Sequence, residues 1–116
     1  DISADELFER IGTEDEPSLM IDVRTPQEYH SPHGHIKKSR LIPLGELLSN
    51  PDIIKEYKDE EIISICHSGS RSMMAAQILA QAGFKDIRNL TGGMMMWHRK
   101  GFPVEREKPE MTGTYY

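Results

Sequence analysis

The sequence predicts an open, doubly wound α/β domain, in which helices cover both faces of a parallel sheet. Two segments of strand length are almost entirely apolar, S-L-M-I-D-V at residues 18–23 and E-I-I-S-I-C at residues 61–66. Such segments are typical of parallel strands that are buried on both faces. Helical patterns alternate with the strand patterns at short intervals, which indicates βαβ units and therefore a parallel sheet.

The first two helices are predicted from their start signals. Ser3 is followed three residues later by Glu6, which forms a capping box ahead of an apolar helical pattern. The same signal returns after the first strand, where Thr25 and Glu28 enclose a proline at the first helical position. We therefore expect one short helix on each side of the strand at residues 18–23.

The middle of the chain is predicted to run from loop to strand to helix. Residues 30–40 contain proline and glycine without a hydrophobic period, so they should form a loop that leads into the strand L-I-P-L at 41–44. Pro43 should end this strand, because it has no N–H to donate to a neighbouring strand. Helical patterns follow at 44–48 and 52–57.

The last third of the chain predicts a long helix, a strand, a glycine turn and a short helix. Apolar residues recur at helical spacing from residue 74 to residue 82, and the strand D-I-R-N-L follows at 86–90. The methionines at 73–74 and 94–96 are expected to pack in the core, with a surface for a donor or a partner protein as the alternative, and Trp97 is expected to anchor the last helix against the sheet. We expect residues 1–106 to form a single domain and residues 107–116 a loose tail.

The composition is that of an ordinary globular domain with an acidic balance. Of the 116 residues, 37% are hydrophobic and 28% are charged, which differs from the composition typical of disorder and suits one domain. A net charge of −5 argues against nucleic acid as a partner, and no apolar run has the length of a membrane span. A single cysteine cannot form an intramolecular disulfide, so we expect a reducing, cytoplasmic setting. The composition does not predict an oligomeric state.

The single cysteine, Cys66, stands where α/β folds place their ligands. It ends a predicted buried strand, precedes Gly69, and lies a few residues before a helix N-terminus. Unpaired backbone N–H groups and the positive end of the helix dipole favour an anion at such a position. The same field should lower the pKa of the thiol and stabilise the thiolate, which is the nucleophilic form. A buried cysteine that only packs is the alternative interpretation.

The segment C-H-S-G-S-R-S, which follows an apolar strand, resembles the active-site loop of the rhodanese family. Four further segments resemble signatures of that family, in order and at suitable intervals: I-D-V-R-T-P-Q-E-Y, G-H-I, L-I-P-L-G-E-L and L-T-G-G-M-M-M-W. The resemblance covers nearly the whole chain. It implies a mostly five-stranded parallel sheet flanked by helices on both faces, and a sulfurtransferase of the thiosulfate:cyanide type.

The resemblance also implies a covalent reaction at Cys66, the expected catalytic nucleophile. Its thiolate would attack the outer sulfur of thiosulfate or a related sulfane donor, and the resulting persulfide would pass its sulfur to cyanide, a thiol or a protein acceptor. Backbone N–H groups and hydroxyls of the loop would stabilise the negative charge, and no metal or cofactor is required. The expected substrate-binding residues are His67, Ser68, Gly69, Ser70 and Arg71.

Two side chains of this loop have more than one interpretation. Arg71 suits either an oxyanion of the donor or a carbonyl of the loop, and a purely structural role is the alternative. His67 stands where family members often carry arginine. It is either an exposed residue without a role or a group whose titration makes activity depend on pH.

Charged and histidine residues elsewhere are expected to build the fold. Arg24 and Glu28 are predicted to form an ion pair that holds the connection after the first strand. Asp22, at the end of that strand, either positions the loop or stabilises the structure. The pattern H-x-x-H-x-H at residues 30–35 contains metal-binding side chains, but its proline and glycine favour a loop over a zinc site.

Two other functions fit the same fold. Phosphatases and arsenate reductases of this type place five residues between cysteine and arginine, which makes room for a tetrahedral oxyanion. Four residues separate Cys66 from Arg71, so the pocket should suit a single sulfur atom. A non-catalytic interaction module is the other alternative, and the presence of a cysteine at the start of the loop argues against it. The sequence does not predict the physiological sulfur donor or acceptor.

Overall fold

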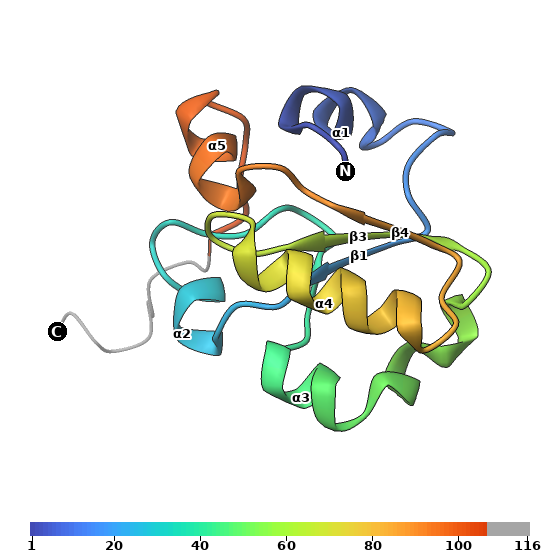
Figure 1. Cartoon of the computed structure of the whole chain (residues 1–116). Coiled ribbons are helices and arrows are strands. Elements are labelled where there is room, and N and C mark those ends of the chain that lie inside the picture. The colour runs from blue at the N-terminus through green and yellow to red at the C-terminus, as the bar shows by residue number, and fades with distance from the viewer. Residues whose placement is uncertain (107–116) are drawn as a thin grey trace, which may run out of the picture.

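The computed structural model describes residues 1–106 and confirms the α/β fold class (Figure 1). Four parallel strands form one sheet in the order β2-β1-β3-β4. The strands are β1 (Leu19–Asp22), β2 (Arg40–Leu41), β3 (Glu61–Ile65) and β4 (Asp86–Asn89). The predicted tail at 107–116 lies outside the described residues.

Within residues 1–106 the sheet differs from the expectation in two ways: β2 covers Arg40–Leu41 instead of residues 41–44, and the fifth strand is absent. At the outer edge of β4, the described chain has an isolated parallel bridge between Ile2 and Leu90 instead of a strand. Helix α1 begins at Ala4, directly after this bridge. Ile2 donates its N–H to the carbonyl of Asn89, so the N-terminus still covers this edge of the sheet.

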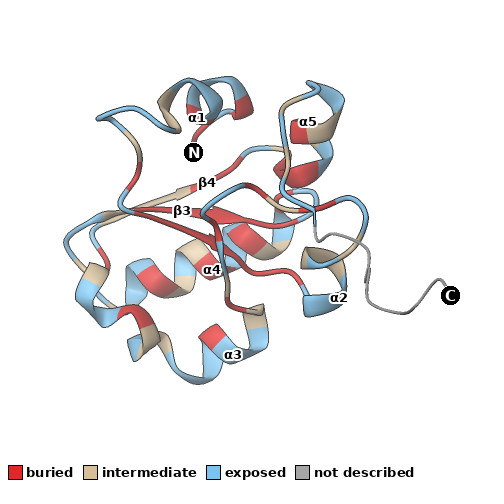
Figure 2. Cartoon of the chain, turned by 180° about the vertical axis from the view of Figure 1, so that it is seen from behind, coloured by how far each residue is buried: buried red, intermediate tan, exposed pale blue. Residues whose placement is uncertain are grey.

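Helices cover both faces of the sheet, as predicted (Figures 1 and 2). Helices α1 (Ala4–Arg10) and α5 (Gly93–Arg99) lie on one face. The other face carries α3 (Leu44–Ser49), the short 3₁₀ helix η1 (Pro51–Tyr57) and α4 (Ser70–Gln81). Helix α2 (Pro26–Tyr29) follows β1 and begins with the predicted capping box of Thr25 and Glu28. Within residues 1–106, no helix has the length and apolar character needed to cross a bilayer.

The sheet has a hydrophobic core on each face, which explains the continuous apolar runs of the sequence. Successive side chains of a strand point to opposite faces, and β1 and β3 are buried in both directions. The core beneath α3, η1 and α4 includes Leu19, Ile21, Ile62, Cys66 and Leu79. The core beneath α1 and α5 includes Met20, Ile63, Ile65, Leu90 and Trp97.

The prediction that the methionines pack in the core was wrong for three of the five. Met73, Met74 and Met95 are 45–48% exposed, whereas Met94 is buried. Helix α4 buries Ser72, Ala75 and Leu79, so its two methionines fall on the outer side of the helix. The prediction for Trp97 is confirmed, since its ring is buried and its indole N–H donates to the carbonyl of Pro103 at 2.9 Å.

Candidate active site

Cys66 follows the last residue of β3 and lies at the carboxyl edge of the sheet. Cys66 is 0% exposed, and its side chain packs on the α4 face of the sheet, in the same core as the side chain of Ile62. The loop then turns into α4 through Gly69, whose φ of 109° is in the left-handed region that glycine adopts without strain. The turn brings the backbone N–H of Gly69 back to within 3.0 Å of the Cys66 Sγ.

Hydrogen bonds to the sulfur lower the pKa of Cys66. Burial alone would raise the pKa of the thiol, and it is the largest single influence. The hydroxyl of Ser72, at 3.3 Å from Sγ, and the backbone N–H groups of Ser72, Gly69 and Ser68 outweigh it. These donors surround the start of a helix, where the helix dipole also favours negative charge. The site therefore stabilises a thiolate in a place that excludes water.

Ser72 and Asn89 extend this arrangement, and the sequence analysis assigned neither of them a role, although Ser72 is the last residue of the segment C-H-S-G-S-R-S. Both residues are buried, and the Ser72 hydroxyl contacts the Asn89 Oδ1 as well as the Cys66 Sγ. A hydroxyl has a single proton. The acceptors within reach of that proton are the Cys66 Sγ, the Asn89 Oδ1 and the carbonyl of Gly69, so Ser72 joins the sulfur to the end of β4 and to its own loop. The available signal was the position of Asn89 at the end of the strand beside β3.

The glycines of the segment L-T-G-G hold the loop from the other side. Gly93 begins α5, and a side chain at this position would collide with the backbone carbonyls of Cys66 and His67. Without one, α5 comes close enough for its first N–H groups to bind the loop. Met94 donates to the carbonyl of Cys66 and Met95 to that of His67, each at 2.8 Å. The backbone of the loop is therefore fixed by α5 while its N–H groups remain directed at the sulfur.

Arg71 forms a two-pronged ion pair with Glu28, with nitrogen–oxygen distances of 2.7 and 2.8 Å. The bonds to Glu28 are the main reason that the pKa of Arg71 is raised. The nearby Cys66 thiolate adds to this effect to a smaller extent. Glu28 in turn has its pKa lowered to about 2, mainly by the bond to Arg71. The pair joins α2 to the first turn of α4 and leaves about a third of each side chain exposed.

The prediction that Arg24 pairs with Glu28 was wrong. Arg24 instead folds back on Asp22, donating from Nε and Nη2 to its carboxylate at 2.8–3.1 Å. It also donates to the carbonyl of Gly34 at 2.9 Å, and both charged side chains are almost completely buried. The physical reason is that Asp22 ends β1 inside the protein, where only a cation can compensate its charge. Glu28 is left free for Arg71, 43 residues further along the chain.

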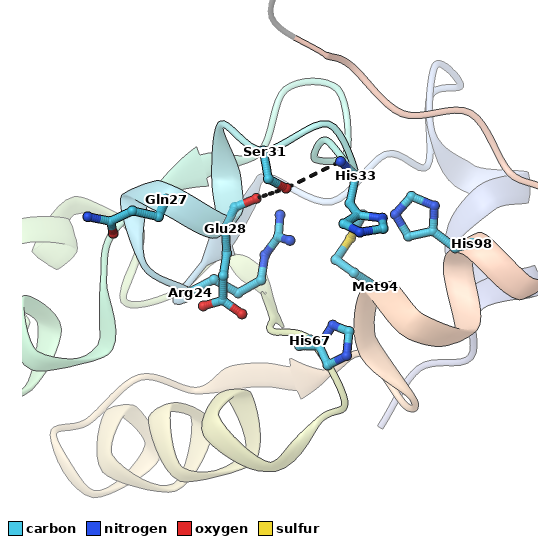
Figure 3. Close-up of a pocket in the computed structure, with 8 residues that line it drawn as sticks. All are labelled: Arg24, Gln27, Glu28, Ser31, His33, His67, Met94 and His98. Carbon is cyan, nitrogen blue, oxygen red and sulfur yellow. Dashed lines mark hydrogen bonds between the residues drawn. The ribbon is translucent and has the colours of Figure 1, made fainter.

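A cavity of about 360 Å³ opens beside the loop, between α2, the segment after it and α5 (Figure 3). Its walls include Arg24, Glu28, His33, His67, Met94 and His98. His67 is thus exposed at the mouth of this cavity, while Ser68, Gly69 and Ser70 line a smaller recess on the opposite side of the loop together with Met73 and Asn89. The sequence analysis did not single out His98.

The three histidines of the H-x-x-H-x-H segment do not come together at one point. His35 stacks on the ring of Tyr29, and its Nδ1 is 3.0 Å from the Tyr29 carbonyl. His33 packs edge-on against the ring of His98 in the cavity, and the rings of His30 and Tyr29 meet edge to face. Among residues 1–106, no three side chains of His, Cys, Asp or Glu converge in a way that would hold a metal ion.

Comparison with known proteins matches this fold and loop to one family. The model of the rhodanese-like domain matches residues 3–100. The protein named sulfurtransferase from Allochromatium vinosum is 32% identical over 105 residues, which cover 90% of this chain and 92% of the relative. The Bacillus subtilis protein YrkF is 39% identical over 95 residues, but this chain spans only 49% of its length.

A solved structure agrees with the family match. The rhodanese-related protein from Thermoplasma volcanium superposes with a TM-score of 0.78 at 34% sequence identity, over 91% of this chain and 97% of that one. The likeness extends over nearly the whole chain and shows that the two proteins share a fold. The chain belongs to the family of rhodanese-like domains.

Proposed function

We propose that this protein is a sulfurtransferase that carries sulfur as a persulfide on Cys66. The observation that supports this most directly is the buried Cys66 sulfur, which accepts hydrogen bonds from the Gly69 N–H and the Ser72 hydroxyl. Donors that surround a single atom suit a sulfur that alternates between thiolate and persulfide. The naming of the relative from Allochromatium vinosum as a sulfurtransferase agrees with this proposal.

The first half-reaction loads the enzyme. The Cys66 thiolate attacks the outer sulfur of thiosulfate or a related sulfane donor, and a new sulfur–sulfur bond forms. The old sulfur–sulfur bond breaks with its electron pair on sulfite, which leaves. The backbone N–H groups of Ser68, Gly69 and Ser72 lie where the negative charge is transferred. In the second half-reaction, cyanide or a thiol attacks the outer sulfur and the electron pair returns to the Cys66 Sγ.

The remaining loop residues are assigned supporting roles. Ser68 and Ser70 are exposed beside the sulfur and offer hydroxyl donors to a donor molecule that approaches the loop. Arg71 contributes positive charge near Cys66, although its guanidinium is already bound to Glu28. We place the reaction in a reducing compartment such as the cytoplasm, because Cys66 is the only cysteine and must stay reduced between turnovers.

The alternative functions make different predictions at this loop. A phosphatase-like enzyme needs space for a tetrahedral oxyanion next to the sulfur, whereas here the Gly69 N–H and the Ser72 hydroxyl contact the sulfur directly. A non-catalytic module has no need of a thiol with a lowered pKa. Both observations favour sulfur transfer.

The test is a steady-state assay of the purified chain with thiosulfate and cyanide. We expect sulfite and thiocyanate to form in equal amounts, with Cys66→Ala as the inactive control. Phosphate monoesters are assayed in parallel. Hydrolysis of these esters without release of sulfite would overturn the proposal in favour of the phosphatase, and inactivity with every donor and ester would favour the non-catalytic module.

A further inference from the structure

The side chain of Asn89 lies where the end of β4 meets the Cys66 loop. Residues two apart in a strand share a face of the sheet, so Asn89 lies on the α4 face with Ile87, which packs in the same core as Cys66. The register of the sheet places Asn89 opposite Ser64, two residues before Cys66. Only 6% of Asn89 is exposed, so its amide makes its polar contacts inside the protein.

The two ends of the Asn89 amide face different groups. Its Oδ1 contacts the hydroxyl of Ser72, in the first turn of α4. Its Nδ2 lies beside Gly69, where the first carbon of an added side chain would be 3.7 Å away. Asn89 also lines the recess that Ser68 and Ser70 border. The amide thus presents its acceptor to Ser72 and its donor to the loop.

The Ser72 hydroxyl has a single proton and three acceptors within reach. Its oxygen lies 3.3 Å from the Cys66 Sγ and 3.2 Å from the Gly69 carbonyl, and it contacts the Asn89 Oδ1. The Gly69 carbonyl already accepts the backbone N–H of Met73 at 3.1 Å. The hydroxyl proton is therefore shared chiefly between the sulfur and the amide oxygen.

The charge on the sulfur determines which of these two acceptors is the stronger. A hydrogen bond to a charged group is stronger than one between neutral groups. A Cys66 thiolate therefore attracts the hydroxyl proton. A thiol, or the inner sulfur of a persulfide, carries no full charge and leaves the proton to Asn89. Because a hydroxyl turns about its C–O bond, this change requires no movement of the backbone.

The charged groups around the sulfur have fixed partners or are exposed. Arg71 of α4 is paired with Glu28 of α2, and Asp22 at the end of β1 is paired with Arg24. His67, the next residue of the loop, is exposed, so solvent screens its charge. Of the donors to the sulfur, the backbone N–H groups are held in place, whereas a hydroxyl can turn away. The hydroxyl is thus the adjustable part of the site.

We propose that Asn89 is a positioning residue for the Cys66 sulfur, and that its Oδ1 competes with Sγ for the hydroxyl proton of Ser72. The part that concerns the persulfide rests on the sulfurtransferase function proposed above. The proton turns to the thiolate in the free enzyme and to Asn89 when the sulfur is bonded in the persulfide. It turns back when the electron pair returns to Sγ. The O–H bond of Ser72 stays intact throughout.

The experiment changes the acceptor at position 89 in two directions. Asn89→Leu, which is similar in size, removes the acceptor that favours the uncharged sulfur, so the acid dissociation constant of the Cys66 thiol should rise roughly fivefold. Asn89→Asp provides a stronger acceptor at the same place, so the constant should fall roughly tenfold. Ultraviolet absorbance of the thiolate against pH measures both constants without any sulfur donor.

Two further variants show whether Asn89 acts through Ser72. In a Ser72→Ala background, the effect of Asn89→Leu should vanish, and that of Asn89→Asp should shrink to the direct repulsion between two negative charges. Ser64→Ala removes a buried hydroxyl that has no partner among residues 1–106, and as the matched control it should leave the constant unchanged. The midpoint of the pH profile of sulfite release should follow each titration.

A lower dissociation constant in Asn89→Leu would show that the amide donates to Ser72, and it would overturn the proposal. An unchanged constant, or a change in Asn89→Leu that survives in Ser72→Ala, would overturn it as well. In wild-type protein, the NMR signal of the Asn89 side-chain amide should follow the thiol titration and shift on loading with thiosulfate, by more than in Ser72→Ala. A signal equal in both proteins would contradict the proposal. The predicted titrations without any sulfite release would support the role of Asn89 and count against the sulfurtransferase function alone.

Discussion

The two sides of the Cys66 loop differ in how their polar groups are satisfied. On the inner side, Ser72 and Asn89 are buried and bonded to each other, and Ser72 contacts the sulfur. On the outer side, His33, His67 and His98 line an open cavity, and the Nε2 of His98 has no partner among the described residues. A satisfied, buried network is rigid and suits an atom that stays in place, whereas an unsatisfied wall suits a molecule that comes and goes.

The largest effect on stability is expected from Asp22→Asn, which alters the outer side. This substitution leaves the buried guanidinium of Arg24 without a compensating anion. Loss of one partner of a buried pair costs about 3–5 kcal/mol of unfolding free energy, and we expect about 3 because the asparagine oxygen still accepts a bond. Urea unfolding at neutral pH measures the change. A cost below 1 kcal/mol would show that this pair does not hold the outer wall.

Ser72→Ala is expected to have the largest effect on the inner side. The substitution removes a hydrogen bond to the Cys66 sulfur, so the pKa of the thiol should rise and less thiolate should be present at neutral pH. A hydrogen bond to a charged group is worth about 1.5 kcal/mol, which corresponds to roughly a tenfold loss of rate in the loading step. Ultraviolet absorbance of the thiolate against pH, together with sulfite release, provides the measurement. An unchanged titration curve would exclude Ser72 as a donor to the thiolate.

Glu28→Gln is expected to have a smaller, pH-dependent effect, because the Glu28–Arg71 pair is about one third exposed. Such pairs contribute about 0.2–1 kcal/mol at neutral pH. The pKa of Glu28 is lowered to about 2 in the folded protein, so the contribution is present above the ordinary glutamate pKa and is lost as the pH falls towards 2. The unfolding free energies of the wild type and of Glu28→Gln, measured across this pH range, should therefore become more similar as the pH falls. A difference that persists at low pH would contradict the assignment to the ion pair.

Ser64→Ala should have the smallest effect and tests the specificity of the Ser72 result. Ser64 is as buried as Ser72 and lies two residues before Cys66, but its hydroxyl has no partner among the described residues. Removal of an unsatisfied hydroxyl should leave the unfolding free energy unchanged or raise it by up to about 1 kcal/mol. The pKa of Cys66 should not change. A destabilised protein would indicate that Ser64 has a partner after all.

The sequence predicts the parts of this site that depend on local order along the chain. Cys66, the turn at Gly69 and the capping box of Thr25 follow from short patterns, and all three are present in the structure. Contacts between residues that lie far apart in the sequence could not be predicted from such patterns. The pair of Arg71 with Glu28 spans 43 residues, and Arg24 was assigned to the wrong carboxylate because both candidates lie close to it in sequence.

The sequence analysis also missed two residues whose position beside the loop depends on tertiary packing. Asn89 and His98 look like ordinary polar residues in the sequence, and their meaning comes from which strand or helix lies beside the loop. Conversely, Met73, Met74 and Met95 were assigned to the core by residue type, although the helices place them outside. The pattern of burial is decided by packing against the sheet, which short sequence patterns do not encode.

The most direct test of sulfur transfer through Cys66 is intact-mass spectrometry after incubation with thiosulfate. The account predicts a mass increase of one sulfur atom, located on Cys66 by fragmentation, lost on addition of cyanide and absent in Cys66→Ala. No adduct with thiosulfate or any other sulfane donor, or an adduct that survives cyanide, would contradict a persulfide at this residue.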